Sequence, residues 1–159
     1  MNILVLNCGS SSVKYKLIEI KANKTLAEGG VEKIGLPGAF IKLKFEDGSK
    51  KVIDLDITDH TGAIKAIMDV LINPEYGCIK DFNEIDAVGH RVVHGSEKFS
   101  HSVLVTDEVK AKIKEVFSLA PLHNPVNMMG IEAIEKVLPQ VPQVVVFDTA
   151  FHQTMPAKA

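Results

Sequence analysis

A tight polar bend between two apolar segments near the N-terminus constrains the fold of this chain most strongly. Residues 3–6 form a continuous apolar run, which predicts a strand buried on both faces. After the bend at residues 7–12, three apolar side chains alternate with two lysines over residues 13–17, as in a half-buried strand. The segment therefore predicts a β-hairpin. A Walker loop is excluded, because neither its glycine and lysine spacing nor a helix directly after the bend is present.

The bend has the chemistry of an anion-binding site. Gly9 allows the backbone to approach an anion closely, and the hydroxyls of Ser10 and Ser12 supply hydrogen-bond donors. Lys14 adds a positive charge, and Asn7 offers an amide oxygen to phosphate or to a metal-bound water. The alternative interpretation is an ordinary polar turn, since serine-rich turns are frequent.

Arg91 lies among valines near the end of another expected strand, in residues 88–95. An arginine in such surroundings usually has a planar anionic partner, because a buried charge without one costs several kcal/mol. Two interpretations stay open, a structural salt bridge and the recognition of phosphate or carboxylate.

Two further polar groups stand beside expected regular structure. His123 precedes Asn124 and Pro125, which make a good N-cap and first residue of a helix, so His123 is placed to donate to negative charge there. Asp148 follows an apolar strand at residues 144–147, where clefts of α/β proteins form. The alternatives are a solvated loop histidine and an aspartate that caps the next turn.

The rest of the chain alternates strands and helices. A third strand is expected over residues 26–34, and a peripheral hairpin over residues 41–57 turns at Asp47 and Gly48. Asp59 is expected to cap a helix ending before Asn73, and Thr106 to cap a second helix with acidic residues in its first turn. Periodicity alone indicates an α/β protein.

Four segments together resemble the signature segments of the acetate kinase family, which belongs to the acetate and sugar kinase, Hsp70 and actin superfamily. They occur in the expected order and span the chain: NCGSSSVKYKL, GHRVVHG, APLHNP and FDTAFHQTMP. The resemblance implies a ribonuclease-H-like (actin-like ATPase) lobe, with a mixed β-sheet, flanking helices and an inserted β-hairpin. It also implies the following site residues: Asn7, Ser10, Ser12 and Lys14 for phosphate and nucleotide; Arg91, His123 and Asp148 for catalysis; Arg91, Val93 and Leu122 for the acyl substrate; and Asn7 and Asp148 for the metal.

The activity implied by the resemblance is reversible transfer of the ATP γ-phosphate to acetate, giving acetyl phosphate and ADP, with Mg²⁺ as cofactor. The carboxylate is already an anion at neutral pH and needs no base, so a metal role suits Asp148 better than a base role. Two alternatives stay open. One is a propionate or butyrate kinase, and the other is a non-catalytic module that binds a nucleotide or metabolite.

Acetate kinases are far longer than the 159 residues of this chain. Residues 1–159 are therefore expected to be the N-terminal acyl-substrate and phosphate-binding domain of a two-domain enzyme whose C-terminal domain is absent. By the resemblance, the parent enzyme is a homodimer. We expect the isolated chain to be an inactive monomer.

The composition argues against several classes of binding partner for this chain, as the charge, the cysteines and the apolar segments each indicate. The net charge of −2 with well-mixed charges disfavours a nucleic-acid surface, which needs a basic stripe. The two cysteines, Cys8 and Cys78, lack metal-site spacing and are expected to be free thiols. No segment has the length of a signal peptide or an apolar membrane span, so the expected location is the cytoplasm.

Overall fold

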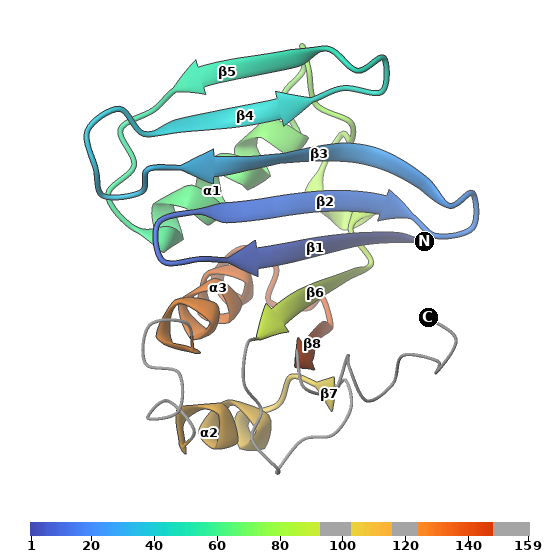
Figure 1. Ribbon diagram of the computed structural model, residues 1–159. Helices are drawn as coiled ribbons and strands as arrows, with labels where there is room; N and C mark the ends of the chain where they lie inside the picture. Colours follow the sequence, from blue (N-terminus) through green and yellow to red (C-terminus); the bar gives the residue numbers. More distant parts are fainter. Residues whose placement is uncertain (93–102, 116–123, 148–159) are drawn as a thin grey trace, which may run out of the picture.

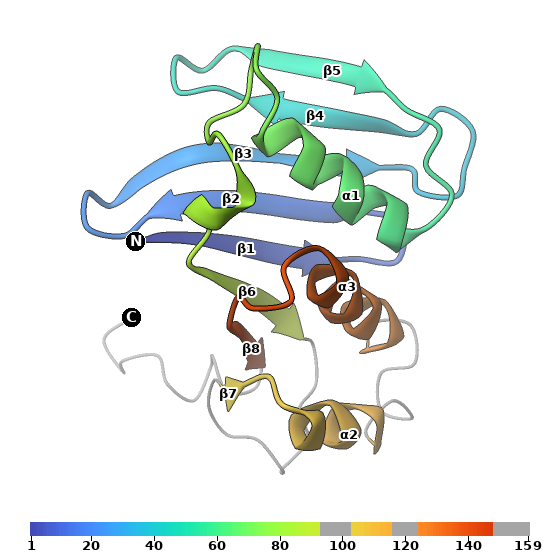
Figure 2. The same ribbon diagram turned by 180° about the vertical axis from the view of Figure 1, so that it is seen from behind.

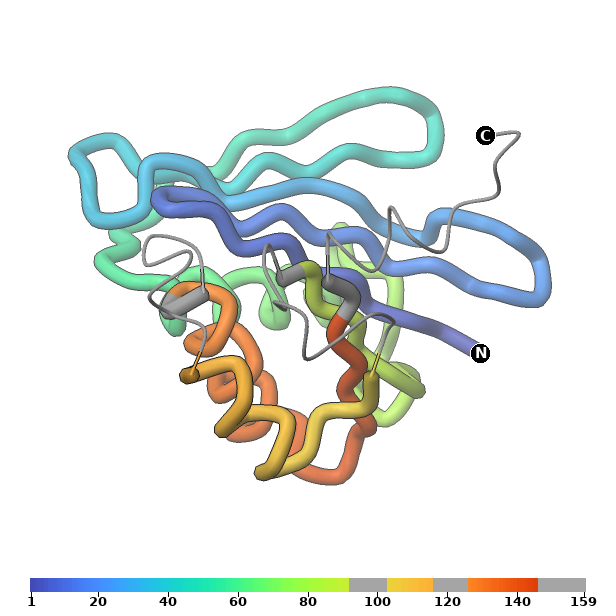
Figure 3. Tube along the Cα trace, turned by 60° about the horizontal axis from the view of Figure 1, so that its bottom comes forward, coloured from blue at the N-terminus to red at the C-terminus, as the bar shows by residue number. Residues whose placement is uncertain are grey.

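The computed structural model describes residues 1–92, 103–115 and 124–147, in which eight strands form one sheet and three α-helices cover one of its faces. Seen from behind, α1 and α3 lie in front of the strands (Figure 2). In the view of Figure 3, with the bottom of the molecule turned toward the viewer, the strands form one layer and the helices form a second layer. The other face of the sheet, opposite the helices, is called the open face below.

The elements follow one another as the alternation of patterns predicted (Figure 1). In chain order they are β1 (Asn2–Cys8), β2 (Val13–Glu19), β3 (Lys24–Glu32), β4 (Phe40–Lys44), β5 (Lys50–Asp54), α1 (His60–Leu71), a short 3₁₀ helix η1 (Phe82–Glu84), β6 (Ala87–Val92), β7 (Val103–Leu104), α2 (Asp107–Glu115), α3 (Asn124–Val137) and β8 (Gln143–Phe147).

The sheet is mixed, with the strand order β5-β4-β3-β2-β1-β6-β8-β7. Strands β1 to β5 form an antiparallel meander, whereas β6 pairs in parallel with both β1 and β8. Parallel neighbours need crossover connections, and α3 belongs to the connection that leads from β6 back to β8. The carboxyl ends of β1, β6 and β8 therefore meet at one edge of the sheet.

The N-terminal hairpin forms as the sequence predicted, but the expectation that its first strand is buried on both faces was wrong, because Val5 is 37% exposed on the open face. In β1 and β2, the buried side chains of Leu4, Leu6, Val13 and Leu17 face the helices, and the alternate positions face away. Lys14 and Lys16 are exposed on the open face, as their alternation with apolar residues indicated.

The helix starts are also as predicted. The Asp59 side chain accepts a hydrogen bond of 2.7 Å from the Gly62 N–H, and the Thr106 hydroxyl accepts one of 3.1 Å from the Val109 N–H. Helix α1 buries Ile64, among others, in the main core under β2 and β3. These caps satisfy backbone donors that the first helical turn leaves without partners.

A second, smaller cluster holds α2 in place. Ile113 of α2 packs with Met128 and Ile131 of α3 and with Val145 of β8, all buried. At the surface, Nζ of Lys110 in α2 lies 3.0 Å from a carboxylate oxygen of Glu135 in α3. Val145 pairs with His90, so both side chains point to the face of the sheet that the helices cover. Because Ile113 packs on Val145, α2 lies on the same face as α1 and α3.

Some details differ from the sequence predictions. The peripheral hairpin is present, but it continues the main sheet through the pairing of β3 with β4 instead of forming a layer over a lobe. Strand β5 ends at Asp54, whereas the alternating pattern ran on to Ile57. Helix α3 begins at Asn124, one position before the predicted first helical residue. Sequence periodicity does not include the hydrogen bonds that decide such boundaries.

Candidate functional site

Three polar residues from neighbouring strands lie on the open face at the carboxyl edge of the sheet. Asn7 of β1 pairs directly with Lys14 of β2, and alternation places both side chains on the open face. Leu6 pairs with His90 of β6, so Arg91 follows at the level of Asn7 and on its face. Because adjacent strands are about 4.8 Å apart, the three Cα positions span roughly 10 Å. Two cations thus flank an amide.

The expectation that Arg91 is buried was wrong. Its side chain is exposed, because the odd positions of β6 face away from the helices while Val88 and His90 face inward. The valines beside Arg91 in the sequence do not surround it, since successive side chains of a strand point to opposite faces. An exposed arginine on the open face is accessible to a ligand.

The turn between β1 and β2 is held by the protein behind it. The Ser12 carbonyl accepts a hydrogen bond of 2.7 Å from the Gly9 N–H, and the Ser11 carbonyl accepts one of 2.9 Å from the Ile34 N–H. The Gly9 carbonyl lies 2.6 Å from Nε2 of His60, the first residue of α1. A Cβ at Gly9 would lie 2.9 Å from Ser12 Oγ, so a larger residue here would require the Ser12 side chain to move.

Two helix N-termini lie at the same edge as this turn. The first residue of α1 contacts Gly9, and α3 leads into β8, so α3 runs opposite to the parallel strands and begins at their carboxyl edge. The partial positive charge of a helix N-terminus favours negative ligands. Together with Lys14 and Arg91, these helix ends place positive charge at the edge, while the Asp59 cap of α1 adds a negative charge.

Beneath the turn, buried groups are tightly packed. Burial raises the pKa of the Cys8 thiol to about 12, so this thiol stays protonated and acts as an apolar side chain. A Cβ at Gly130 of α3 would lie 2.9 Å from Cys8 Sγ, so glycine allows the helix to approach β1.

Cys78 is also a free thiol, as predicted, and burial raises its pKa to about 11.

His90 forms a buried polar link between β6, β8 and α3. Its Nε2 lies 2.5 Å from Oε1 of Gln143, and Nε2 of Gln143 donates to the Ile131 carbonyl at 3.3 Å. Since an amide oxygen only accepts, His90 Nε2 carries the proton in this bond. Burial lowers the pKa of His90 to about 4, so the imidazole is neutral near pH 7.

Helix α3 also buries Asn127, whose Nδ2 has no hydrogen-bond partner among the described residues. Asn127 lies one turn before Gly130, on the side of α3 that faces the sheet. A buried amide without a partner is costly, which makes Asn127 an unusual feature of the N-terminal half of α3.

Four of the predicted site residues lie outside the described residues: Val93, Leu122, His123 and Asp148. The neighbouring described residues are Val92 at the end of β6, Asn124 at the start of α3 and Phe147 at the end of β8. Over residues 1–92, 103–115 and 124–147, no three His, Cys, Asp or Glu side chains gather in a metal-binding group.

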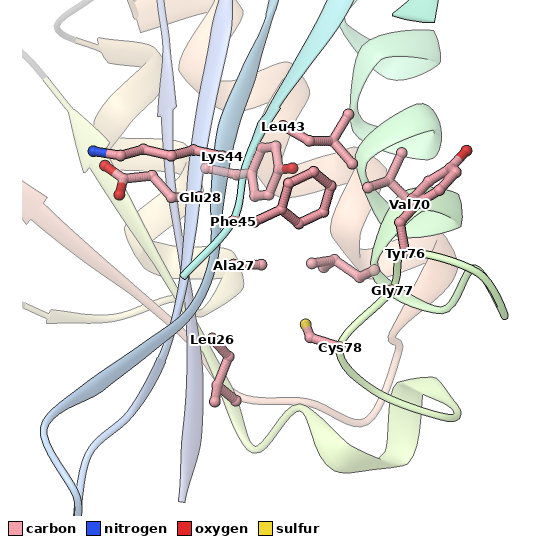
Figure 4. A pocket seen from close by; sticks show the side chains of 12 residues that line it. Leu26, Ala27, Glu28, Leu43, Lys44, Phe45, Val70, Tyr76, Gly77 and Cys78 are labelled. Carbon is pink, nitrogen blue, oxygen red and sulfur yellow. The ribbon is translucent and has the colours of Figure 1, made fainter. Parts of the chain in front are cut away.

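Two hollows lie near these elements. One is lined by Tyr15, Phe45, Val70, Tyr76 and Cys78, near the C-terminus of α1 and thus at the opposite end of this helix from the Gly9 turn (Figure 4). Its volume of about 20 Å³ is room for about one water, and no predicted site residue lines it. A shallower hollow of about 260 Å³ lies beside Lys14 on the open face.

The sequence also matches a known family over almost its whole length. Residues 2–159 match the acetokinase family. The chain belongs to this family. As a member of the acetokinase family, it corresponds to the N-terminal portion of acetate kinases. Among the described helices, none has the length and apolar character needed to cross a membrane.

Curated relatives of this acetokinase family member are closely similar in sequence. The chain is 61% identical to an acetate kinase of Porphyromonas gingivalis over 156 residues, covering 98% of this chain and 39% of the relative. It is 58% identical to an acetate kinase of Desulfitobacterium hafniense over 159 residues, covering 100% and 40%. The chain therefore spans about two-fifths of the length of these relatives.

Solved structures of the acetokinase family share the fold. The crystal structure of the Porphyromonas gingivalis acetate kinase superposes with a TM-score of 0.92 at 59% identity, covering 99% of this chain and 40% of the other. A propionate kinase from Francisella tularensis superposes with a TM-score of 0.85 at 42% identity, covering 99% and 39%. The α/β fold with a mixed sheet and flanking helices is confirmed.

Sequence reasoning missed three buried polar residues, which are His60, Asn127 and Gln143. None of the three was singled out, although His60 directly follows the predicted Asp59 cap. The one local signal was the polar character of each residue within an apolar pattern, which indicates a specific partner but does not identify it.

Proposed function

We propose that this chain supplies the acyl-substrate and phosphate-binding domain of an acetate kinase, which transfers the γ-phosphate of ATP to acetate and forms acetyl phosphate and ADP. The observation that carries the proposal is the alignment of Lys14, Asn7 and Arg91 across β2, β1 and β6, beside the Gly9–Ser12 turn. High identity to acetate kinases over the whole chain supports it.

Each residue has a role that its chemistry suits. The hydroxyls of Ser10 and Ser12, with Lys14, bind the phosphates of ATP. Arg91 offsets the repulsion between acetate and the phosphoryl group, because a guanidinium can bind two anionic oxygens at once. His123 donates to the phosphoryl group in transfer, and Val93 and Leu122 form walls of the small acyl pocket. These last three roles rest on the family resemblance.

The donor set fits a magnesium ion that arrives with the nucleotide. Asn7 supplies an amide oxygen at the end of β1, and Asp148 is the first residue after β8. Mg²⁺ usually binds one or two protein carboxylates together with substrate phosphates and several waters, so a larger protein cage is not required. When bound, the ion neutralises phosphate charge.

The reaction needs no general base on the protein. A carboxylic acid with a pKa of about 4 to 5 is already ionised at neutral pH, so its oxygen attacks the γ-phosphorus directly while the bond to the ADP oxygen breaks. Both electron pairs are then accounted for without a proton transfer. The protein's work is positioning and charge compensation, and a phosphohistidine on His123 would contradict this scheme.

A second candidate substrate is propionate. The propionate kinase from Francisella tularensis superposes on this chain with a TM-score of 0.85. The same fold therefore occurs in a protein that is named for propionate. Val93 favours a small acid, so we propose that acetate is preferred and that propionate is a poorer substrate.

The test compares this 159-residue chain with an extended protein, in which the chain continues with the residues that follow the matched region in the Porphyromonas gingivalis acetate kinase. ATP-dependent acyl phosphate formation is measured with acetate, propionate and butyrate. We expect activity only in the extended protein, with acetate preferred. Arg91→Ala should lower kcat by about 10³-fold, since arginines at phosphoryl-transfer sites contribute roughly 10³ to 10⁵.

The matched control is Lys16→Ala, which removes an exposed cation from the same face of the sheet, two residues from Lys14. Its kcat and KM should stay within about twofold of the unsubstituted values, because exposed surface charges contribute little. Inactivity of the extended protein with all three acids would contradict the proposal and favour a non-catalytic nucleotide-binding module.

A further inference from the structure

Three of the four carbonyl groups of the Gly9–Ser12 turn accept hydrogen bonds from the protein. Ser12 O and Ser11 O accept from backbone N–H groups, and Gly9 O accepts from the His60 side chain at 2.6 Å. Within residues 1–92, 103–115 and 124–147, the bonds that hold the turn engage these oxygens and leave the Ser10 and Ser11 N–H groups without a backbone acceptor. The side of the turn away from α1 therefore presents donors to an anion.

The bond from His60 also fixes the direction of a donor. A peptide unit is planar and trans, so its C=O and N–H point in opposite directions. The unit between Gly9 and Ser10 includes Gly9 O and Ser10 N–H. While His60 holds the oxygen on the α1 side, the Ser10 N–H must point away from α1. Rotation of this unit would instead turn an oxygen, with its partial negative charge, toward the ligand.

Of the three donors that hold the carbonyls of the turn among the described residues, only His60 acts through its side chain. Three features of the structure fix the position of the His60 side chain. It is 6% exposed, it begins α1 directly after the Asp59 cap, and α1 is anchored in the main core by Ile64 and Ile67. Since a carbonyl oxygen only accepts, Nε2 of His60 carries the proton in this bond.

We propose that His60 is a positioning residue for nucleotide binding, and that its Nε2–H holds the Gly9 carbonyl so that the Ser10 N–H faces a phosphate of ATP. The inference rests on the proposed function, because it assumes that the turn binds the phosphates of ATP. His60 itself contacts the turn from behind and need not touch the ligand.

The test uses the extended protein defined above and two substitutions of His60. His60→Phe keeps a ring of similar size and removes the donor, whereas His60→Gln keeps an N–H at a similar reach. The dissociation constant for Mg²⁺-ATP is measured by calorimetry, and KM is measured separately for ATP and acetate. The matched control is Asp59→Ala, which removes the cap of the same helix but no bond to the turn.

For His60→Phe we expect ATP binding to weaken about fivefold to tenfold, the effect of one lost hydrogen bond, with the KM for acetate within about twofold. His60→Gln should restore most of the ATP affinity. Asp59→Ala should lower the melting temperature and leave ATP affinity unchanged. A weaker affinity for ATP with an unchanged KM for acetate distinguishes a positioning role of His60 from a general loss of folding.

Three results would overturn the inference: unchanged ATP affinity in His60→Phe, equal weakening in His60→Phe and His60→Gln, or no ATP binding by the unsubstituted protein. Failure of the proposed function has a different signature. In that case the unsubstituted protein forms no acyl phosphate, while ATP binding and its dependence on His60 are still measured directly.

Discussion

At the scale of single residues, burial decides the chemistry of the groups around the turn. His90 and Arg91 are adjacent in the sequence, yet His90 is buried under α3 and Arg91 is exposed on the open face. The strand's alternation makes His90 a neutral structural group and places Arg91 on an accessible surface. His90 therefore has a consequence for stability that does not involve the substrate.

We predict that His90 makes the fold sensitive to mild acid. Its pKa is about 4 in the folded chain and about 6.5 in the unfolded chain, so between these values the unfolded state binds more protons. The stability contribution is complete above about pH 6.5 and falls as the pH drops toward 4, by about 2 kcal/mol between pH 7 and pH 5.

The measurement is the free energy of unfolding by urea at pH 7 and pH 5, for the unsubstituted chain and for His90→Asn. The variant should be less stable at pH 7, because Gln143 loses its partner. It should also lose less stability on acidification. Equal losses in both proteins would show that His90 does not cause the acid sensitivity.

At the scale of elements, the distance between α3 and β1 is set by small residues. Gly130 lies against Cys8 at the carboxyl end of β1, where an added Cβ would approach the sulfur to 2.9 Å. Alanine usually favours a helix over glycine by about 1 kcal/mol, so glycine here lowers helix propensity and allows close packing. The N-terminus of α3 is thereby held at the edge that carries the turn.

We predict that Gly130→Ala destabilises the chain by about 1 kcal/mol, because overpacking costs about 1–3 kcal/mol and outweighs the gain in helix propensity. In a Cys8→Ala background, the sulfur is absent and the same substitution should become stabilising. A double-mutant cycle on unfolding free energies measures this coupling. Additive effects of the two substitutions would contradict the packing argument.

At the scale of the whole molecule, the described residues form one sheet, with helices and a core on one of its faces. The two edge strands of the described sheet are short: β7 has two residues, and β5 has five with three charged side chains. Short, charged edges disfavour pairing with a second chain. In addition, we propose from the family resemblance that the dimer contacts of the parent enzyme lie mainly in a second domain.

We therefore predict that this 159-residue chain is a monomer. Sedimentation velocity at micromolar concentrations should show a single species that agrees with the chain mass of 17.3 kDa. The extended protein, measured in parallel, should sediment as a dimer. A dimer of the short chain would show that an interface lies within its own residues.

Much of the local structure was predictable from the sequence. The first hairpin, the caps at Asp59 and Thr106, and a strand that contains Arg91 all formed as expected. Each depends on residues within a few positions of one another, so periodicity and capping chemistry describe them. Four sequence motifs also indicated the acetokinase family, and the family match confirmed it.

Only the tertiary structure decided which distant residues meet. His60 reaches Gly9 across 51 positions, and His90 reaches Gln143 across 53. The exposure of Arg91 and the placement of the β4–β5 hairpin in the main sheet likewise followed from strand register and order. Local sequence patterns do not predict these contacts. The contacts arise when helices pack on a sheet, and the crossover connections set the strand order of that sheet.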